Sequence, residues 1–218
     1  MELIRKTTHY VVCLKPRDVV SEDEPGGMPE RISKVLSLPL SSIYPVHRLD
    51  RATSGVMVYA LDAGTAAFLG RAVTEQKMHK LYYAITETAP QVPSGSWTDL
   101  LYWDRKQQKS YVVDRSRKGV KEARMDYEQL TVNADGHALL RVTLHTGRTH
   151  QIRVQCGSRG LPLLGDRRYG SHEHCALALF AYSLSFPDPD SGNEVTCLAP
   201  APDEFPWSDP CFTPFLIS

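Results

Sequence analysis

The stretch His-Arg-Leu-Asp-Arg-Ala-Thr-Ser-Gly, at residues 47–55, places one carboxylate, Asp50, between Arg48 and Arg51. Positive charge nearby favours the ionised form of a carboxylate, and an ionised carboxylate can act as a nucleophile. The arginines are suited to holding an anionic substrate such as nucleic acid. Taken alone, the pattern is also typical of an aspartate in a surface ion-pair network at a turn, so its meaning depends on the rest of the chain.

The residues around this stretch predict alternating strands and helices. Apolar side chains occupy both alternating sets at residues 54–61, which is typical of a strand covered on both faces. Residues 9–14 have the same buried character. Asp62 is a candidate N-cap for a helix that runs to about residue 78. The apolar stripe of that helix is expected to consist of Ala66, Leu69 and Val73.

The remaining segments predict mostly strands. They are a helix at 30–38, strands at 81–86, 125–132, 138–145, 176–186 and 194–198, a hairpin at 100–114, and a short helix from 148 or 149 to between 157 and 160. Asn-Ala-Asp-Gly at residues 133–136 is typical of a hairpin turn. We therefore expect an α+β fold with a mixed, largely antiparallel central sheet flanked by helices and loops. The chain contains no internal repeat, and residues 1–218 are predicted to form a single domain.

The composition is that of a cytoplasmic globular protein. The chain has 218 residues, 42% of them hydrophobic, but no apolar run reaches the ~20 residues that a membrane-spanning helix needs. No signal-peptide pattern is present at the start. Its five cysteines are scattered and odd in number, which favours reduced thiols. His172, His174 and Cys175 lie close in sequence, but their spacing does not fit a structural zinc site, so no metal is expected.

Charge is unevenly distributed although the formal net charge is zero. Residues 105–124 contain eight lysines and arginines against two acids, whereas residues 187–210 contain six acids and no lysine or arginine. A basic segment is often only a solvated face. Its position between the stretch at residues 47–55 and a second motif at residues 146–153 favours contact with a nucleic-acid backbone instead.

The second motif is Thr-Gly-Arg-Thr-His-Gln-Ile-Arg, at residues 146–153. Arg153, at its end, can hold a carboxylate through two parallel hydrogen bonds and cannot lose its charge. Arg148 and His150 lie where a helix is predicted to begin, and donors at such a place suit a phosphate. The alternative for Arg153 is a side chain that extends along a helix surface into water.

Together, the two motifs resemble those of the pseudouridine synthases, specifically the RluA-like branch. Three further elements fall in that family's order: Lys15-Pro16, Lys-Leu-Tyr-Tyr-Ala at residues 80–84, and Leu-Leu-Gly-Asp at residues 163–166 with Tyr169. The resemblance implies an isomerase that converts uridine in ribosomal or transfer RNA to pseudouridine on the family's catalytic fold. It also suggests a catalytic domain without an accessory RNA-binding module.

The resemblance implies specific roles for the motif residues. Asp50 would be the catalytic carboxylate, and Arg153 its basic partner. Tyr82, in the Lys-x-Tyr element, would stack on the uracil or transfer a proton, although a core tyrosine is the other interpretation. The target base would be flipped out of its helix, with Arg48 in the vacated space. The predicted RNA and substrate contacts are Arg48, Arg51, Thr53, Arg148 and His150.

No cofactor is expected, because the isomerisation involves no redox change. The expected partner is RNA, most simply a stem-loop, and no obligate protein partner or membrane is indicated. A non-catalytic RNA-binding protein on the same fold is one alternative, although a pure binder does not need a carboxylate that repels phosphate. A retaining glycoside hydrolase is another, but it needs a second carboxyl group about 5–5.5 Å from the first, and Asp166 is the only acid in the other motifs.

Overall fold

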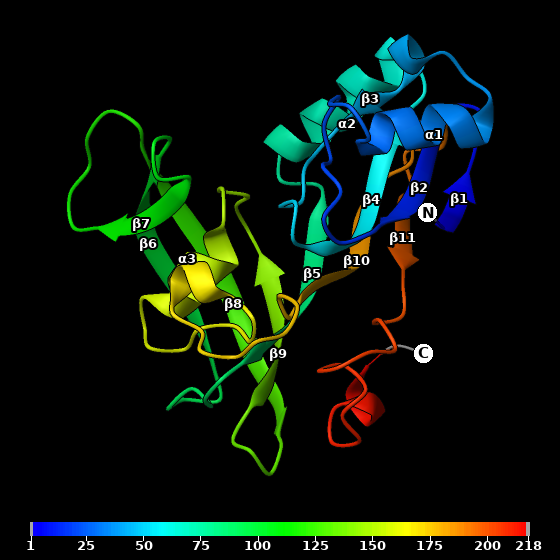
Figure 1. Cartoon of the computed structure of the whole chain (residues 1–218). Coiled ribbons are helices and arrows are strands. Elements are labelled where there is room, and N and C mark those ends of the chain that lie inside the picture. The colour runs from blue at the N-terminus through cyan, green and yellow to red at the C-terminus, as the bar shows by residue number, and fades with distance from the viewer. Residues whose placement is uncertain (1, 217–218) are drawn as a thin grey trace. The chain divides into compact units, whose positions relative to one another are not determined.

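The computed structural model describes residues 2–216, which form two compact units (Figure 1). The first unit contains residues 2–80 and 181–200, and the second contains Leu81–Phe180 and Ala201–Leu216. The residues of two strands, β5 (His79–Thr86) and β10 (Leu179–Pro187), are divided between the units. Among the described residues, no helix is long and apolar enough to cross a membrane.

The first unit is built on strands in the order β1-β2-β4-β10, with β3 beside β4 and β11 beside β10. These strands are β1 (Glu2–Lys6), β2 (Tyr10–Lys15), β3 (Tyr44–Pro45), β4 (Ser54–Ala60) and β11 (Glu194–Leu198). β2 and β4 pair antiparallel, with Val12 opposite Val58. Nearly every residue of both strands is buried, as their continuous apolar character predicts.

Two helices accompany these strands, α1 (Met28–Leu36) and α2 (Ala63–Thr74). The predicted N-cap is confirmed, because Asp62 Oδ1 accepts a hydrogen bond of 2.8 Å from the Thr65 N–H. The expected end near residue 78 is wrong. Gln76 adopts a left-handed backbone conformation (φ +59°), and the Lys77 N–H closes the helix on the Ala72 carbonyl.

The apolar stripe of α2 is also shifted from the predicted one. Its buried side chains are Thr65, Leu69 and Ala72, whereas Ala66 and Val73 are only half-buried. The helix packs against β3 and β4, and that packing selects the face on which Leu69 is central. Helical spacing alone fits several adjacent faces of an alanine-rich helix, so it identified Leu69 but not its companions.

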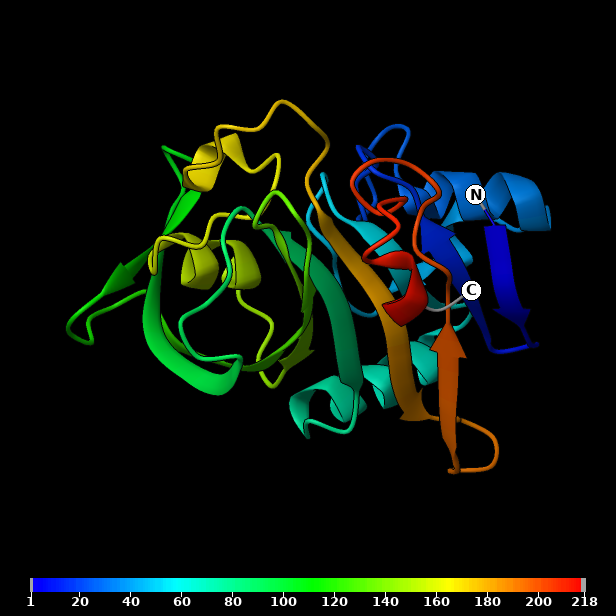
Figure 2. The ribbon, with the colours of Figure 1, turned by 90° about the horizontal axis from the view of Figure 1, so that it is seen from below.

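The second unit carries strands in the order β5-β9-β8-β6-β7. They include β6 (Ser94–Asp104), β7 (Lys109–Val113), β8 (Val120–Val132) and β9 (Ala138–Leu144). The β6–β7 pair is the predicted hairpin, and the Asn-Ala-Asp-Gly turn joins β8 to β9, with Gly136 at φ +87°. Figure 2 shows the strands from β6 to β9 curving around α3 (Gln151–Gly157). Leu101, Ala123 and Val154 belong to one buried cluster there.

The last part of the second unit packs on it through aromatic side chains. Trp207 and Phe212 are buried, and the Trp207 ring packs edge-on against Phe180 at 6.2 Å between ring centres. The Tyr83 hydroxyl donates to the Phe215 carbonyl at 3.1 Å.

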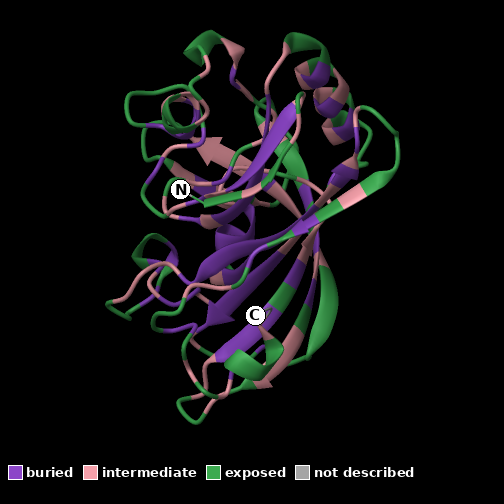
Figure 3. Ribbon diagram, turned by 90° about the vertical axis from the view of Figure 1, so that its right-hand side faces the viewer, coloured by how far each residue is buried: buried purple, intermediate pink, exposed green. Residues whose placement is uncertain are grey.

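Buried residues follow the strands in Figure 3. The fold is of the predicted α+β class, with a mixed sheet and three α-helices among residues 2–216.

Gly55, the last residue of the opening motif, is required where the chain enters β4. Its φ of +143° is one that side-chain-bearing residues rarely adopt, and a Cβ there would lie 2.4 Å from the Ala181 carbonyl oxygen. Gly55→Ala is expected to lower the free energy of unfolding by about 3 kcal/mol, because backbone strain adds to overpacking. Denaturant unfolding measures the loss.

Gly70→Ala is the matched control. Gly70 lies inside α2, and nothing stands within 4 Å of a Cβ built on it. Because alanine has the higher helix propensity, this change is expected to stabilise the protein by about 0.5–1 kcal/mol. Equal stability of the two variants would show that the close approach at Ala181 can relax.

Candidate active site

The Asp50 carboxylate projects from a tight turn that immediately precedes β4. The Thr53 N–H donates to the Asp50 carbonyl at 3.0 Å, which closes the turn. Ser21 anchors the preceding residue, because its hydroxyl donates to the Leu49 carbonyl and accepts from the Leu49 N–H. Leu49 and Thr53 are buried on either side, whereas Asp50 is half-buried. The carboxylate is thus carried by a backbone that is fixed at both ends.

Lys15, at the end of β2, lies beneath this turn and is fully buried. Its ammonium donates to the carbonyls of Val19, Pro16 and Arg51 at 2.7, 3.0 and 3.1 Å, so each of its three N–H groups has an acceptor. Burial lowers the pKa of Lys15 to about 8, and the negative charge of Asp50 opposes that shift. Lys15 therefore remains mostly protonated at neutral pH and supplies a cation close to Asp50.

The sequence places Lys15 in the Lys-Pro element, and that element by itself indicates no site role for it. The sequence feature that points to a role for Lys15 is its position directly after the apolar run at residues 10–14. Lysine is almost never fully buried without partners, so its place at the end of a core strand already indicated a structural or electrostatic role. What the sequence could not show is that its three acceptors come from two different loops.

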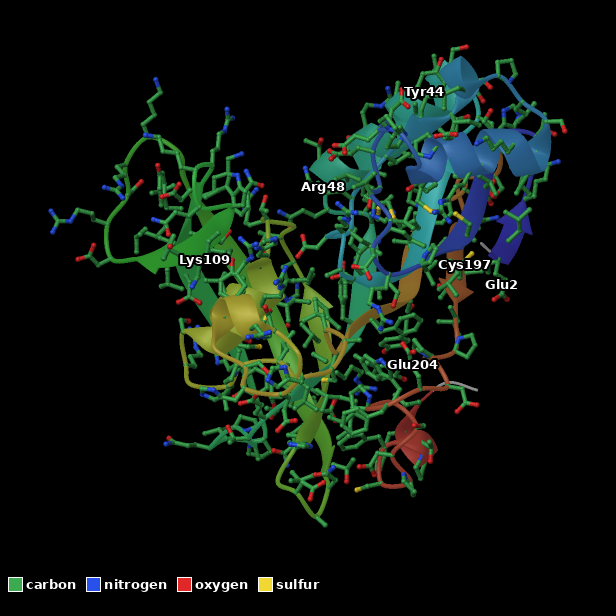
Figure 4. All side chains as sticks on the ribbon, in the orientation of Figure 1. Glu2, Tyr44, Arg48, Lys109, Cys197 and Glu204 are labelled. Atoms are coloured by element: carbon green, nitrogen blue, oxygen red, sulfur yellow. The ribbon has the colours of Figure 1, made fainter. Side chains whose placement is uncertain are left out.

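The two arginines that flank Asp50 in sequence are on the exposed side of the loop. Arg48, labelled in Figure 4, forms an ion pair with Glu22 at 3.1 Å, and its side chain is 60% exposed. The Arg51 Nε donates to the Asp18 carbonyl at 3.2 Å, which ties the loop to the segment before α1. Both guanidinium groups therefore remain accessible to a ligand from solvent.

His47 and Thr53 are directed inward. The His47 Nε2 accepts a hydrogen bond from the Val58 N–H at 3.2 Å, and burial keeps its pKa well below the usual value, so the ring is neutral. Thr53 is buried, and within the described part of the chain its hydroxyl has no hydrogen-bond partner. The sequence motif indicates no role for His47, but its contact with Val58 fixes the start of the motif to β4.

In the second unit, Arg153 lies on α3 and is almost completely buried. Its Nε and Nη2 atoms donate to the two carboxylate oxygens of Asp166 at 2.7 and 2.8 Å, and Asp166 is buried as well. The alternative of an arginine extended along a helix surface is therefore wrong. Arg153 binds a carboxylate in the bidentate geometry open to arginine, and that carboxylate belongs to Asp166. The pairing with Asp50 expected from the sequence remains a prediction.

The helix that carries Arg153 begins at Gln151 and not at Arg148 or Thr149, as predicted. His150 adopts a left-handed conformation (φ +56°), which interrupts the helical path before it. The Gln151 side chain accepts from the Thr146 hydroxyl and the Arg148 N–H, and it donates to the Arg124 carbonyl. The Arg148 Nε donates to the Glu122 carbonyl at 2.7 Å. Arg148 and His150 are therefore positioned by a loop clamped to β8.

Tyr82 lies on β5 and is only 5% exposed, and the next residue, Tyr83, is only 3% exposed. Successive side chains of a strand project from opposite faces, so the two rings have different surroundings. The Tyr83 hydroxyl donates to the Phe215 carbonyl.

All basic side chains of the segment at residues 105–124 except the half-buried Lys109 are exposed. Arg105 and Lys106 form the tip of the β6–β7 hairpin, where the Asp104 carboxylate accepts from the backbone N–H groups of Lys106 and Gln107. Lys109, labelled in Figure 4, begins β7. The remaining basic side chains of the segment, all exposed, are Arg115, Arg117, Lys118, Lys121 and Arg124.

Comparison with known proteins points to one family. Residues 9–158 match the family described as RNA pseudouridylate synthase. An uncharacterized RNA pseudouridine synthase of Haemophilus influenzae is 29% identical over 214 residues, which are 96% of this chain and 92% of that protein. The dual-specificity RNA pseudouridine synthase RluA of Escherichia coli is 33% identical over 210 residues, 91% of this chain and 92% of its own length.

A solved structure shares the fold. Human RNA pseudouridylate synthase domain containing 1 superposes with a TM-score of 0.77 at 23% identity, over 95% of this chain and 85% of the human chain. At that level of identity the likeness concerns the arrangement of strands and helices alone. The similarity to the two bacterial proteins is one of sequence. It extends over nearly the whole length of this chain and of each of those proteins.

Proposed function

Because the chain belongs to the RNA pseudouridylate synthase family and is an RNA pseudouridine synthase, we propose that it isomerises specific uridines of ribosomal or transfer RNA with Asp50 as the catalytic carboxylate. The observation that carries this proposal is the Asp50 turn itself. It is fixed by Ser21 and Thr53 and lies close to the charge of the buried Lys15. A rigid, electrostatically supported carboxylate is what this chemistry requires.

The reaction exchanges one glycosidic bond for another. The bond between C1′ of the ribose and N1 of uracil breaks, the base rotates, and a bond forms between C1′ and C5. The C5 proton is lost and N1 gains a proton, so atoms and electrons balance without a cofactor. Asp50 can act on the sugar or the base as nucleophile, or remove the C5 proton as general base.

Tyr82 and Arg153 complete the proposed catalytic set. Tyr82 is placed by the Lys-x-Tyr element, and its buried position on β5 suits a ring that stacks on an unpaired base. Arg153 is proposed to keep the catalytic carboxylate anionic, in addition to its pair with Asp166. Its burial strengthens any such electrostatic effect, because fewer waters screen it.

The remaining predicted residues, except Thr53, are proposed to bind RNA. Arg51, Arg148 and His150 provide donors, and the basic segment at residues 105–124 follows the phosphate backbone. The hydroxyl of Thr53, the other predicted contact, is buried, so Thr53 is proposed to support the Asp50 turn instead. A stem-loop is the simplest substrate that such a surface can grip. Residues 1–218 are proposed to act as one catalytic domain, since the family match at residues 9–158 includes parts of both units. A cytoplasmic location remains a prediction.

Neither alternative function is favoured. Membership of an enzyme family argues against a non-catalytic RNA-binding protein, and so does the presence of all three catalytic candidates. A retaining glycosidase would need Asp166 as its second, protonatable acid. Asp166 is instead buried, and both of its carboxylate oxygens accept hydrogen bonds from Arg153.

The direct test is to map pseudouridine in RNA with and without the protein. Total RNA from cells that lack the gene would be incubated with the purified protein, and pseudouridine sites would be located by mass spectrometry. We expect new pseudouridine at one or a few positions in loops of ribosomal or transfer RNA. If no position in either class changes, the proposed substrates are wrong.

Arg48→Ala is expected to slow the reaction on stacked targets more than on unstacked ones. Flipping a base costs a few kcal/mol of stacking, least for a base that is already unpaired, and an exposed guanidinium can fill the gap. The measurement is the single-turnover rate on two RNAs that differ only in whether the target uridine is stacked. Glu22→Gln, which removes the partner of Arg48, is the control and should retain the wild-type preference. An equal loss on both RNAs would assign Arg48 to phosphate or to Asp50 instead.

A further inference from the structure

Tyr169, in the second unit, makes several polar contacts, and the proposed reaction assigns it no role. It ends η2 (Arg167–Tyr169) and is buried. Its hydroxyl lies 2.9 Å from the His150 Nδ1 and accepts a hydrogen bond of 2.8 Å from the Ser110 N–H. Its ring lies 5.2 Å from the guanidinium carbon of Arg153. One side chain thus contacts both a proposed substrate-binding residue and a proposed catalytic residue.

The contacts of the Tyr169 hydroxyl favour one tautomer of His150. The Ser110 N–H can only donate, so the Tyr169 oxygen is its acceptor. The phenolic hydrogen is then available to the His150 Nδ1, 2.9 Å away. Burial raises the pKa of Tyr169, so the phenol keeps this hydrogen at neutral pH. An Nδ1 that accepts leaves the imidazole proton on Nε2, which makes Nε2 a donor.

The same residue also holds Arg153 from a second side. Asp166 grips the guanidinium edge-on through its carboxylate, while the Tyr169 ring lies against the group at cation–π distance. Asp166 and Tyr169 are linked by a hydrogen bond from the Tyr169 N–H to the Asp166 carbonyl at 2.9 Å. The orientation of Arg153 and the tautomer of His150 therefore depend on one short segment.

Strand β7 connects this segment to the basic hairpin. Ser110 is buried, and its hydroxyl donates to the Thr149 carbonyl at 2.5 Å, next to His150. Lys109, its neighbour, places its ammonium 5.2 Å from the centre of the Tyr169 ring. The His150 ring is further confined by an edge-on contact with Trp103 of β6 at 5.2 Å.

We propose that Tyr169 is a positioning residue that fixes His150 as an Nε2–H donor and orients Arg153 for the isomerisation. A neutral Nε2–H suits a neutral acceptor, and the acceptor of that kind on the substrate is a carbonyl oxygen of the target uracil. The phosphates are better served by the exposed cations of the basic segment. The role toward uracil rests on the proposed function, whereas the tautomer assignment does not.

Tyr169→Phe tests the proposal because it removes only the hydroxyl. The first measurement is the long-range ¹H–¹⁵N correlation spectrum of the histidine rings without RNA, with the His150 signal assigned by its loss in His150→Gln. The wild type should show Nδ1 unprotonated and Nε2 protonated, and Tyr169→Phe should show a mixture. The second measurement is single-turnover pseudouridine formation, expected to fall about tenfold to hundredfold, with the RNA Kd unchanged within about twofold.

Tyr127→Phe is the matched control. Tyr127 is also buried in the second unit, and its hydroxyl donates to the Val92 carbonyl at 3.0 Å. It should leave the tautomer and the rate unaltered. A wild-type spectrum with the proton on Nδ1, an unaltered rate in Tyr169→Phe, or an equal rate loss in Tyr127→Phe would each overturn the proposal. If the wild type modified no RNA, the proposed function would fail, and the spectrum without RNA would still decide the tautomer.

Discussion

Asp50→Asn is expected to reduce tritium release from RNA labelled at C5 of uridine to background, with the fold unaltered. Asparagine keeps the shape of the side chain but can neither attack carbon nor accept the C5 proton as a carboxylate does. The turn itself is held by backbone groups and by Ser21, so it should survive the change. Circular dichroism and the denaturation midpoint check the fold, and tritium release checks the chemistry.

Asp18→Asn provides the matched control. Asp18 lies in the segment bonded to Arg51 and, like Asp50, interacts electrostatically with Lys15, but its side chain is 73% exposed. Asparagine tolerates the left-handed backbone found at this position (φ +63°). This variant should turn over at close to the wild-type rate. Residual turnover near wild type in Asp50→Asn would remove Asp50 from the catalytic role.

Arg153→Leu is expected to abolish detectable catalysis and to destabilise the protein. Its removal leaves the Asp166 carboxylate, only 2% exposed, without its bidentate partner. Breaking one side of a buried pair typically costs about 3–5 kcal/mol. RNA affinity should fall much less than the single-turnover rate at temperatures where the variant is folded, because we propose that the phosphate contacts come from the exposed cations of residues 105–124.

The double variant Arg153→Leu/Asp166→Leu separates the two effects. Replacing both members of a buried ion pair by apolar residues is often close to neutral for stability, so the double variant should unfold at a midpoint nearer to wild type. It should remain inactive if Arg153 acts in catalysis. Recovery of activity together with stability would make Arg153 purely structural, and loss of binding with intact single-turnover chemistry would reverse its assigned role.

The sequence located most of the elements that carry the site. The buried character of β2 and β4, the Asp62 cap and the β6–β7 hairpin were all predicted correctly, because each depends on a local pattern of polarity or capping. The errors fall at boundaries. α2 ends early at a left-handed Gln76, and α3 begins late after a left-handed His150. Backbone conformations of this kind are selected by neighbouring segments, which a local pattern does not contain.

By itself, the sequence determined the family, the reaction and the candidate catalytic residues, because ordered motifs encode the chemical groups that the reaction needs. Only the tertiary structure revealed that Lys15 is the buried cation beneath the Asp50 turn, that Asp166 grips Arg153, and that Tyr169 joins His150 to Ser110. Each of these contacts joins residues that lie 13 to 59 positions apart. Their partners are decided by which loops the folded sheet brings together and buries, since a buried polar group must find its hydrogen bonds within reach.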